Sequence, residues 1–149
     1  MILERGNMWD AFGKGIFMIT TNPVRRKDGA VVMGRGIALE AKKRFPNLPY
    51  DFGEQLEKFP HLNSVGYIGT YDGAPIYYFM VKDHWREPAS LEIIERSVAA
   101  IDYWFWISDT NDRVDLNFPG IGNGKLKRED VLPLLENLPD NFHVWEYGD

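Results

Sequence analysis

The stretch Val32-Met33-Gly34-Arg35-Gly36-Ile37-Ala38 runs directly into a predicted helix, Gly36–Phe45. Four apolar residues share one face of this helix, namely Ile37, Ala38, Ala41 and Phe45. The basic residues lie on the other face, and Pro46 closes the helix. Glycines let the backbone approach a ligand closely, and the N–H groups of a helix N-terminus carry partial positive charge. The stretch therefore predicts a loop and helix start that face an anion.

A second glycine-rich stretch, Gly120-Ile121-Gly122-Asn123-Gly124, lies between a predicted strand, Arg113–Phe118, and a predicted helix, Glu129–Leu135. Either loop alone is often only a tight turn, but two loops that both follow strands and precede helices favour phosphate binding. Neither has the P-loop pattern or the complete dinucleotide-binding pattern. A hydrogen bond to a charged group contributes about 1.5–3 kcal/mol, so a few such bonds would hold a diphosphate at micromolar affinity.

The remaining elements alternate between strand and helix. The predicted strands are Met1–Leu3, Ile16–Thr20, Ser64–Tyr71, Ile76–Val81, Arg113–Phe118 and Phe142–Tyr147. The predicted helices are Gly36–Phe45, Phe52–Phe59, one that opens at Ser90, and Glu129–Leu135. This order predicts a three-layer α/β/α domain over residues 1–149, with a mixed, mostly parallel central sheet that is antiparallel at its edges.

Several local signals refine these elements. Asp72-Gly73 predicts a hairpin turn, and Pro75 suits the edge of the strand that follows. The helix that opens at Ser90 has apolar residues at three- and four-residue steps, which are Leu91, Ile94, Val98, Ile101 and Phe105. Pro133 is tolerable in the last helix only near its start.

A third candidate site is Val81-Lys82-Asp83-His84-Trp85-Arg86, just past an apolar strand, at the end of the sheet where open α/β domains place their sites. Lys82 could act there as a nucleophile or as an electrostatic clamp. The alternative is that Lys82 and Arg86 are surface charges and that Trp85 packs in the core.

Composition narrows the function classes. Apolar residues make up 44% of the 149 residues, which argues against disorder. The absence of cysteine excludes a disulfide framework and a thiolate zinc site, and it suits the cytoplasm. No apolar run could cross a membrane, and Met1–Gly6 does not resemble a signal peptide. We expect a cytoplasmic monomer with no cofactor, no metal and no membrane contact. The net charge of −5 does not favour a polyanion, although basic clusters lie at 25–27, 42–44 and 125–128.

These motifs resemble the macrodomains, in particular the branch of the DNA ADP-ribosyl glycohydrolase antitoxins and the terminal ADP-ribose glycohydrolase. Five segments carry the likeness in the family's order: Gly6-Asn7-Met8; Thr21-Asn22 with Val32–Leu39; Lys42–Pro46; Lys82–Arg86 with Ser90-Leu91-Glu92; and Gly122-Asn123-Gly124. The stretch with His84-Trp85-Arg86 is the most specific of them.

The resemblance implies that the ligand is ADP-ribose or an ADP-ribosylated DNA, protein or metabolite. It implies that Asn7 lies near the adenine, that Asn22 approaches the distal ribose, and that Lys82 acts at the anomeric carbon, with His84, Trp85 and Arg86 in possible support. The loops expected to surround the diphosphate comprise Val32, Met33, Gly34, Arg35, Gly36 and Ile37, and Gly120, Ile121, Gly122, Asn123, Gly124, Lys125 and Leu126.

Two departures from the family pattern leave the activity open. The family has an aspartate that assists the lysine, and Lys127 stands at the position that would carry it. The segment Pro23–Ala30 is also longer than the family loop and contains Arg25-Arg26-Lys27. We therefore predict an ADP-ribosyl glycohydrolase, with two alternatives: a non-catalytic ADP-ribose reader and an ADP-ribose 1″-phosphate phosphatase.

Overall fold

A six-stranded mixed sheet forms the middle layer of the computed structural model, which describes residues 1–108 and 111–147 without the side chains of 104–108. The strand order is β1-β6-β5-β2-β4-β3. The strands are β1 (Ile2–Arg5), β2 (Ile16–Thr21), β3 (Val65–Tyr71), β4 (Ala74–Met80), β5 (Val114–Asn117) and β6 (Phe142–Glu146). The helices are α1 (Gly36–Arg44), α2 (Leu48–Lys58), α3 (Leu91–Ser108) and α4 (Arg128–Leu135), with short 3-10 helices η1 (Met8–Ala11) and η2 (Gly122–Gly124).

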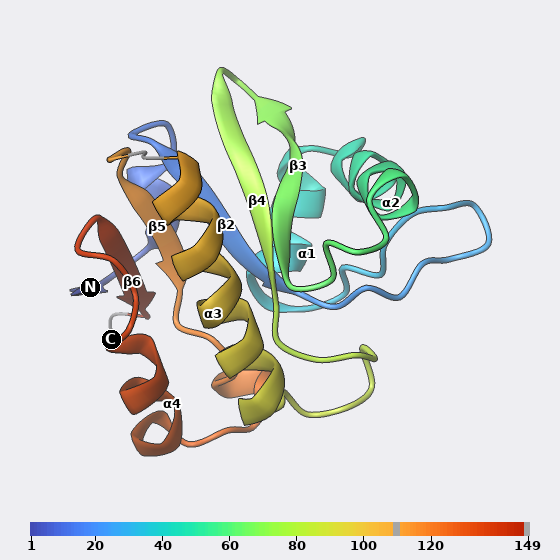
Figure 1. Ribbon diagram of the computed structural model, residues 1–149. Helices are drawn as coiled ribbons and strands as arrows, with labels where there is room; N and C mark the ends of the chain where they lie inside the picture. Colours follow the sequence, from blue (N-terminus) through green and yellow to red (C-terminus); the bar gives the residue numbers. More distant parts are fainter. Residues whose placement is uncertain (109–110, 148–149) are drawn as a thin grey trace.

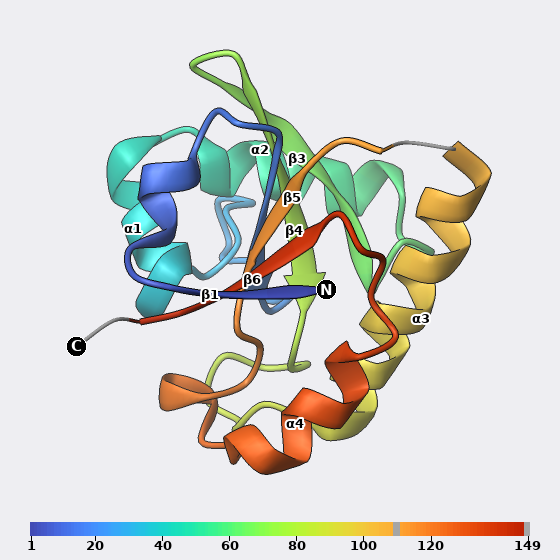
Figure 2. The ribbon, with the colours of Figure 1, turned by 90° about the vertical axis from the view of Figure 1, so that its left-hand side faces the viewer.

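The helices cover both faces of the sheet, which confirms the predicted three layers. Helices α3 and α4 lie on one face, and α1 and α2 lie on the other (Figures 1 and 2). Two apolar clusters fill the spaces between the layers, and the strands contribute to both clusters because alternate side chains point to opposite faces. The predicted strands and helices are all present, and most of their bounds agree to within about three residues.

The prediction of antiparallel edges holds at only one edge of the sheet. Strand β3 runs antiparallel to β4 because the two-residue turn at Asp72 and Gly73, with φ of 50° and 80°, forces the chain to reverse. At the other edge, β1 runs parallel to β6, with Ile2 paired to His143, so that prediction was wrong. Most of the chain separates β1 from β6, so no tight turn dictates their direction.

Two local predictions about helices also need correction. In α3 the buried face is made by Ile93, Ile94, Val98 and Ile101, whereas Leu91 is 37% exposed. The side chain of Phe105 lies outside the described residues. Pro133 is the sixth of the eight residues of α4, so it lies near the helix end and not near its start. Pro133 has no N–H to donate to the helix. Because only Leu134 and Leu135 follow it in α4, the missing hydrogen bond disrupts little of the helix.

Pro75 lies where its missing N–H has little effect on the sheet. It is the second residue of β4 and is paired with Thr70 of β3. Pairing of β4 with its other neighbour, β2, begins one residue later at Ile76. Strand β4 is therefore an interior strand, and its proline sits at the end that β2 does not reach.

Candidate ligand cleft

A cleft of about 620 Å³ opens at the carboxyl ends of the parallel strands. This volume falls within the range of about 300–1,000 Å³ that is typical of small-molecule sites. The strand ends contribute Thr20, Thr21, Asn117, Phe118, Trp145 and Glu146, and Val81 and Lys82 follow β4 directly. The carboxyl end of an open α/β sheet is where such folds place their ligands.

The first glycine-rich loop forms one wall of the cleft. All six residues from Val32 to Ile37 line it. Asn22 fixes the start of this loop, because its side-chain N–H donates to the carbonyl of Val32 at 3.0 Å and its side-chain oxygen accepts from the N–H of Val24 at 2.9 Å. Asn22 lines the cleft, and both of its polar side-chain atoms bond to the main chain.

The first turn of α1 presents free donors to the cleft. The bond from the Leu39 N–H to the Arg35 carbonyl is the earliest one at this end of the helix. Among the described residues, the N–H groups of Gly36, Ile37 and Ala38 have no acceptor. Gly36 has φ of 59°, a conformation that glycine adopts without strain. The start of α1 therefore offers three free main-chain donors to the cleft.

The second glycine-rich loop forms the opposite wall. Residues Gly120 to Lys125 all line the cleft. Leu126 does not line it, and its side chain packs against the apolar cluster under α3 and α4. A Cβ atom on Gly36 would lie 3.7 Å from the side-chain nitrogen of Asn123, so the two loops meet across the cleft.

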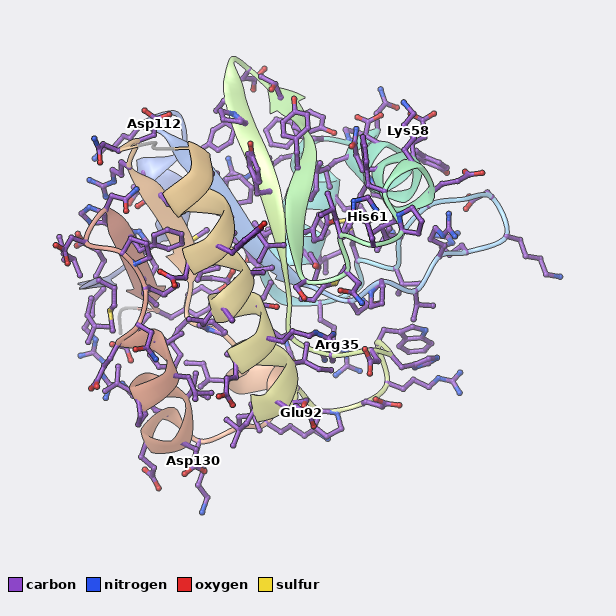
Figure 3. All side chains as sticks on the ribbon, viewed as in Figure 1. Arg35, Lys58, His61, Glu92, Asp112 and Asp130 are labelled. Atoms are coloured by element: carbon purple, nitrogen blue, oxygen red, sulfur yellow. The ribbon has the colours of Figure 1, made fainter. Side chains whose placement is uncertain are left out.

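Lys82 lies in the same cleft, one residue past the buried Val81. The pKa of its ammonium group is lowered, first by burial and then by the positive charges of Arg35 and Lys125. Figure 3 shows Arg35 at the end of the sheet where β4 runs into the loop that begins with Lys82. The cationic neighbours of this lysine therefore come from the two glycine-rich loops.

The residues after Lys82 form part of the rim. Trp85 is 42% exposed and lines the cleft, which excludes the alternative that it packs in the core. The guanidinium of Arg86 lies 4.6 Å from the centre of the Trp85 ring, so Arg86 stacks on tryptophan. His84 does not line the cleft, and its Nδ1 accepts the N–H of Arg86 at 3.2 Å.

Asn7 lies beside the main cleft and not in it. Its side-chain oxygen accepts the N–H of Trp9 at 3.0 Å and so caps η1. Asn7 lines a small neighbouring pocket. The residues shared by this pocket and the main cleft are Ile37, Asn117, Trp145, Glu146 and Tyr147. The small pocket therefore extends the cleft toward η1.

Sequence reasoning missed most of the strand-end residues. Asn117 makes a two-way bond with Thr20, accepting its N–H at 3.0 Å and donating to its hydroxyl at 2.8 Å. Trp145 donates from its indole nitrogen to the buried carboxylate of Asp115 at 2.8 Å, which fixes its ring at the cleft. No glycine marks these positions, and their only signal is that they lie at the ends of predicted parallel strands.

Lys127 is exposed and does not line the cleft. It is the N-cap residue of α4, and Glu129 and Asp130 are exposed in the first turn of that helix. Within the described residues, the carboxylates at the cleft wall belong to Glu87 and Glu146. Glu146 is also paired with Arg128.

The described part of the chain contains no group of histidine and acidic side chains arranged to hold a metal ion. None of its helices combines the length and apolarity needed to span a membrane. The cleft is therefore the site whose chemistry has to be explained.

Comparison with known proteins gives a consistent picture, although no family model matches the chain. A DNA ADP-ribosyl glycohydrolase of Thermus aquaticus is 31% identical over 127 residues, which is 78% of this chain and 34% of that protein. The enzyme of the same name from Mycobacterium tuberculosis is 32% identical over 118 residues, covering 73% of this chain and 33% of that protein. The chain thus spans about a third of the length of these relatives.

Among solved structures, the macrodomain of Mycobacterium tuberculosis DarG matches with a TM-score of 0.72 and 29% identity, over 99% of this chain and 97% of that one. The macrodomain of Thermus aquaticus DarG matches with a TM-score of 0.72 and 26% identity, with the same coverage. DarTG of Thermosipho africanus in complex with ADP-ribose has the same fold, with a TM-score of 0.74 and 20% identity, over 99% of this chain and 42% of that one.

The sheet order, the two facing loops and these matches define a macrodomain. Within the macrodomains, the chain belongs to the branch that contains the DarG macrodomains.

Proposed function

We propose that this macrodomain binds ADP-ribose in its cleft and hydrolyses the glycosidic bond that joins ADP-ribose to a carrier. The observation that carries the proposal is the position of Lys82. Its amine lies in the same cleft as two loops of main-chain donors, and its pKa is lowered toward the range in which the amine is nucleophilic. The curated relatives are named for this reaction on DNA.

Binding is supported by the donors of the two loops. The N–H groups of Gly36, Ile37 and Ala38 are free in the described structure, and those of Ile121, Gly122 and Asn123 have no acceptor there either. In the proposed arrangement they surround the diphosphate, and Arg35 and Lys125 add two positive charges. The adenine would lie at the end of the main cleft that borders the small pocket beside Asn7, and the distal ribose would then lie toward Lys82.

The chemistry proposed for Lys82 needs no partner outside the site except water. The neutral amine attacks the anomeric carbon, and the bond from that carbon to the carrier breaks. The departing carrier keeps the bonding electron pair and ends with the proton that the amine loses. Water then replaces the amine at the anomeric carbon, which releases ADP-ribose and restores the free lysine.

A second candidate function is an ADP-ribose reader without catalysis. The observation in its favour is that Lys127 stands at the position of the family aspartate and is exposed outside the cleft. No carboxylate is among the groups that shift the pKa of Lys82. The reader would use the same loops and the same ligand.

The test compares the parent protein with Lys82→Ala and with Lys127→Ala, a matched lysine outside the cleft. Each protein is incubated with ADP-ribosylated DNA, with a glutamate-linked ADP-ribosyl protein and with ADP-ribose 1″-phosphate, and ADP-ribose affinity is measured by calorimetry. We expect turnover of a glycosidic substrate by the parent and by Lys127→Ala only, with ADP-ribose affinity within several-fold in all three. The glycosylamine formed on Lys82 can open its ribose ring to an imine, with the N–H proton moving to the ring oxygen, and borohydride should reduce this imine and so trap a lysyl adduct in the parent.

The other outcomes decide between the alternatives. Good ADP-ribose binding without turnover of any substrate would support the reader. Full activity of Lys82→Ala would point to a water-based phosphatase or hydrolase, and absence of ADP-ribose binding would contradict the whole proposal. The expected monomer and its expected cytoplasmic location stay predictions.

A further inference from the structure

Residues 23–31, here called the basic arm, project from the cleft margin and belong to no described helix or strand. The residues that flank the arm, Asn22 and Val32, both line the cleft, whereas no residue of the arm does. Figure 1 shows this light-blue segment leaving the sheet at the end of β2 and extending past α2. The arm is therefore rooted at the cleft and directed away from it.

The arm is held firmly by its own backbone. Arg25 and Val31 form an antiparallel bridge, and the N–H of Arg26 donates to the carbonyl of Ala30 at 2.7 Å. The N–H of Gly29 donates to the carbonyl of Arg26 at 3.0 Å, which closes the turn with Gly29 at φ of 91°. These bonds give the arm a defined shape in which its charged side chains lie on the outside.

The arm is also fixed to α2. The N–H of Val31 donates to the carbonyl of Pro49 at 3.0 Å, and the hydroxyl of Tyr50 donates to the carboxylate of Asp28 at 3.0 Å. Asp28 also accepts the N–H of Ala30 at 3.2 Å, and these bonds lower its pKa. The one acidic side chain of the arm is thus occupied in holding the arm in place.

Three consecutive cations, Arg25, Arg26 and Lys27, remain exposed on this rigid arm. None of them takes part in a salt bridge of the described residues. The whole chain has a net charge of −5, so the arm is a local positive feature on an acidic protein. Clustered cations on a surface beside a ligand cleft favour an anionic partner by steering and by direct contact.

The diphosphate of ADP-ribose is not that partner, because its place would be in the cleft, where Arg35 and Lys125 already supply positive charge. Because no residue of the arm lines the cleft, any anion that the arm contacts would lie outside the ADP-ribosyl group and would belong to the carrier. A nucleic-acid strand carries a phosphate at each nucleotide and so offers regularly spaced anions beside the modified base.

We propose that the basic arm binds the sugar-phosphate backbone of a nucleic-acid strand that carries the ADP-ribosyl group, so that Arg25, Arg26 and Lys27 determine preference for a nucleic-acid carrier. This proposal rests on the proposed function of the cleft and adds a second binding surface to it. Phosphate contacts of this kind fix the position of a strand without reading its sequence.

The test measures binding of a short ADP-ribosylated single-stranded oligonucleotide, in a Lys82→Ala background that prevents turnover. It compares Arg26→Ala/Lys27→Ala with Lys42→Ala/Lys43→Ala, which removes the same number of charges from the far end of α1. Free ADP-ribose is titrated into every variant by calorimetry. Arg25→Ala is added in a third variant, which removes the remaining cation of the arm.

We expect the arm variant to bind the modified oligonucleotide several-fold more weakly at low salt, with ADP-ribose affinity unchanged. If both cations contact phosphates, the slope of log affinity against log salt falls by about 1.4. The loss should be the same for two oligonucleotides of different sequence, and the α1 variant should behave as the parent does.

Equal behaviour of the arm and α1 variants would overturn the proposal while leaving ADP-ribose binding intact. A loss seen equally with an ADP-ribosylated acidic peptide would also overturn it, since the arm would then recognise negative charge in general. If the cleft does not bind ADP-ribose at all, calorimetry shows no heat of binding in the parent protein. That result would contradict the proposed function of the cleft and is distinct from a failure of the arm proposal.

Discussion

A Cβ atom placed on Gly53 would lie 1.9 Å from the carbonyl oxygen of Gly29, so helix α2 and the basic arm touch backbone against backbone. Glycine inside a helix costs roughly 0.5–1 kcal/mol relative to alanine. Glycine is nevertheless needed at position 53, because the Gly29 carbonyl of the arm occupies the space that any side chain would fill. The contact joins α2 to the basic arm, which leads into the first glycine-rich loop.

Gly53→Ala should therefore destabilise the protein despite the better helix propensity of alanine. The carbonyl of Gly29 must move, and overpacking of this kind costs about 1–3 kcal/mol. Because 1 kcal/mol shifts the Tm of a domain this size by roughly 2–4 °C, a thermal melt should show a clear decrease. Gly34→Ala is the matched control, since a Cβ there meets nothing within 4 Å. A Gly53→Ala Tm equal to that of the parent would contradict this packing.

A valine substitution should have different effects in the two glycine-rich loops, at Gly34 in the first and at Gly122 in the second. Gly34 lies in open space, so Gly34→Val should keep the parent Tm and lose ADP-ribose binding because its side chain fills the ligand's place. Gly122 has φ of 64°, and an L-residue pays roughly 1–2 kcal/mol there, so Gly122→Val should lose both binding and some stability. Calorimetry and a thermal melt on both variants measure this contrast. Normal ADP-ribose binding by either variant would mean that its loop does not hold the diphosphate.

The sequence predicted the fold well wherever a short segment determines its own conformation. The turn at Asp72-Gly73 fixes an antiparallel pair, and Ser90 predicts the start of α3, where its hydroxyl accepts the N–H of Ile93 at 3.3 Å. Glycine spacing located both walls of the cleft for the same reason. The direction of β1 could not be predicted in this way, because it depends on a partner at the other end of the chain.

The site was less predictable where a side chain acts through distant neighbours. Arg86 lies in the same sequence motif as Lys82, but its guanidinium stacks on Trp85. The cations that lower the pKa of Lys82 are Arg35 and Lys125, which are distant in sequence. The indole of Trp145 reaches the cleft because Asp115 holds it, and that pair is 30 residues apart. Such contacts depend on the order of the strands in the sheet, and the periodicity of the sequence does not reveal that order.

The pH dependence of turnover should depend on Arg35. Since the pKa of Lys82 is lowered in the folded protein, its neutral nucleophilic form appears at lower pH than for an ordinary lysine. Arg35→Gln removes one of the charges that disfavour the ammonium, so the pKa of Lys82 should rise and the acid limb of the pH–rate profile should move to higher pH. Arg86→Gln is the control and should leave that limb in place. If the acid limb shifted in Arg86→Gln but not in Arg35→Gln, Arg86 and not Arg35 would be the cation that lowers the pKa of Lys82.

The last prediction concerns Lys127, the residue at the position of the family aspartate. If the missing carboxylate alone limited turnover, Lys127→Asp would restore it. In the structure Lys127 is exposed, does not line the cleft, and is the N-cap of α4 with no capping bond from its side chain. An aspartate at an N-cap accepts a main-chain N–H and interacts favourably with the helix dipole, which together stabilise by about 0.5–2 kcal/mol. Lys127→Asp should thus raise the Tm and leave turnover and the trapped lysyl adduct unchanged. Lys127→Ala, which removes the charge without supplying a cap, separates the two effects and should give a smaller rise. A faster release of the adduct in Lys127→Asp would show instead that this segment moves into the cleft when ligand is bound.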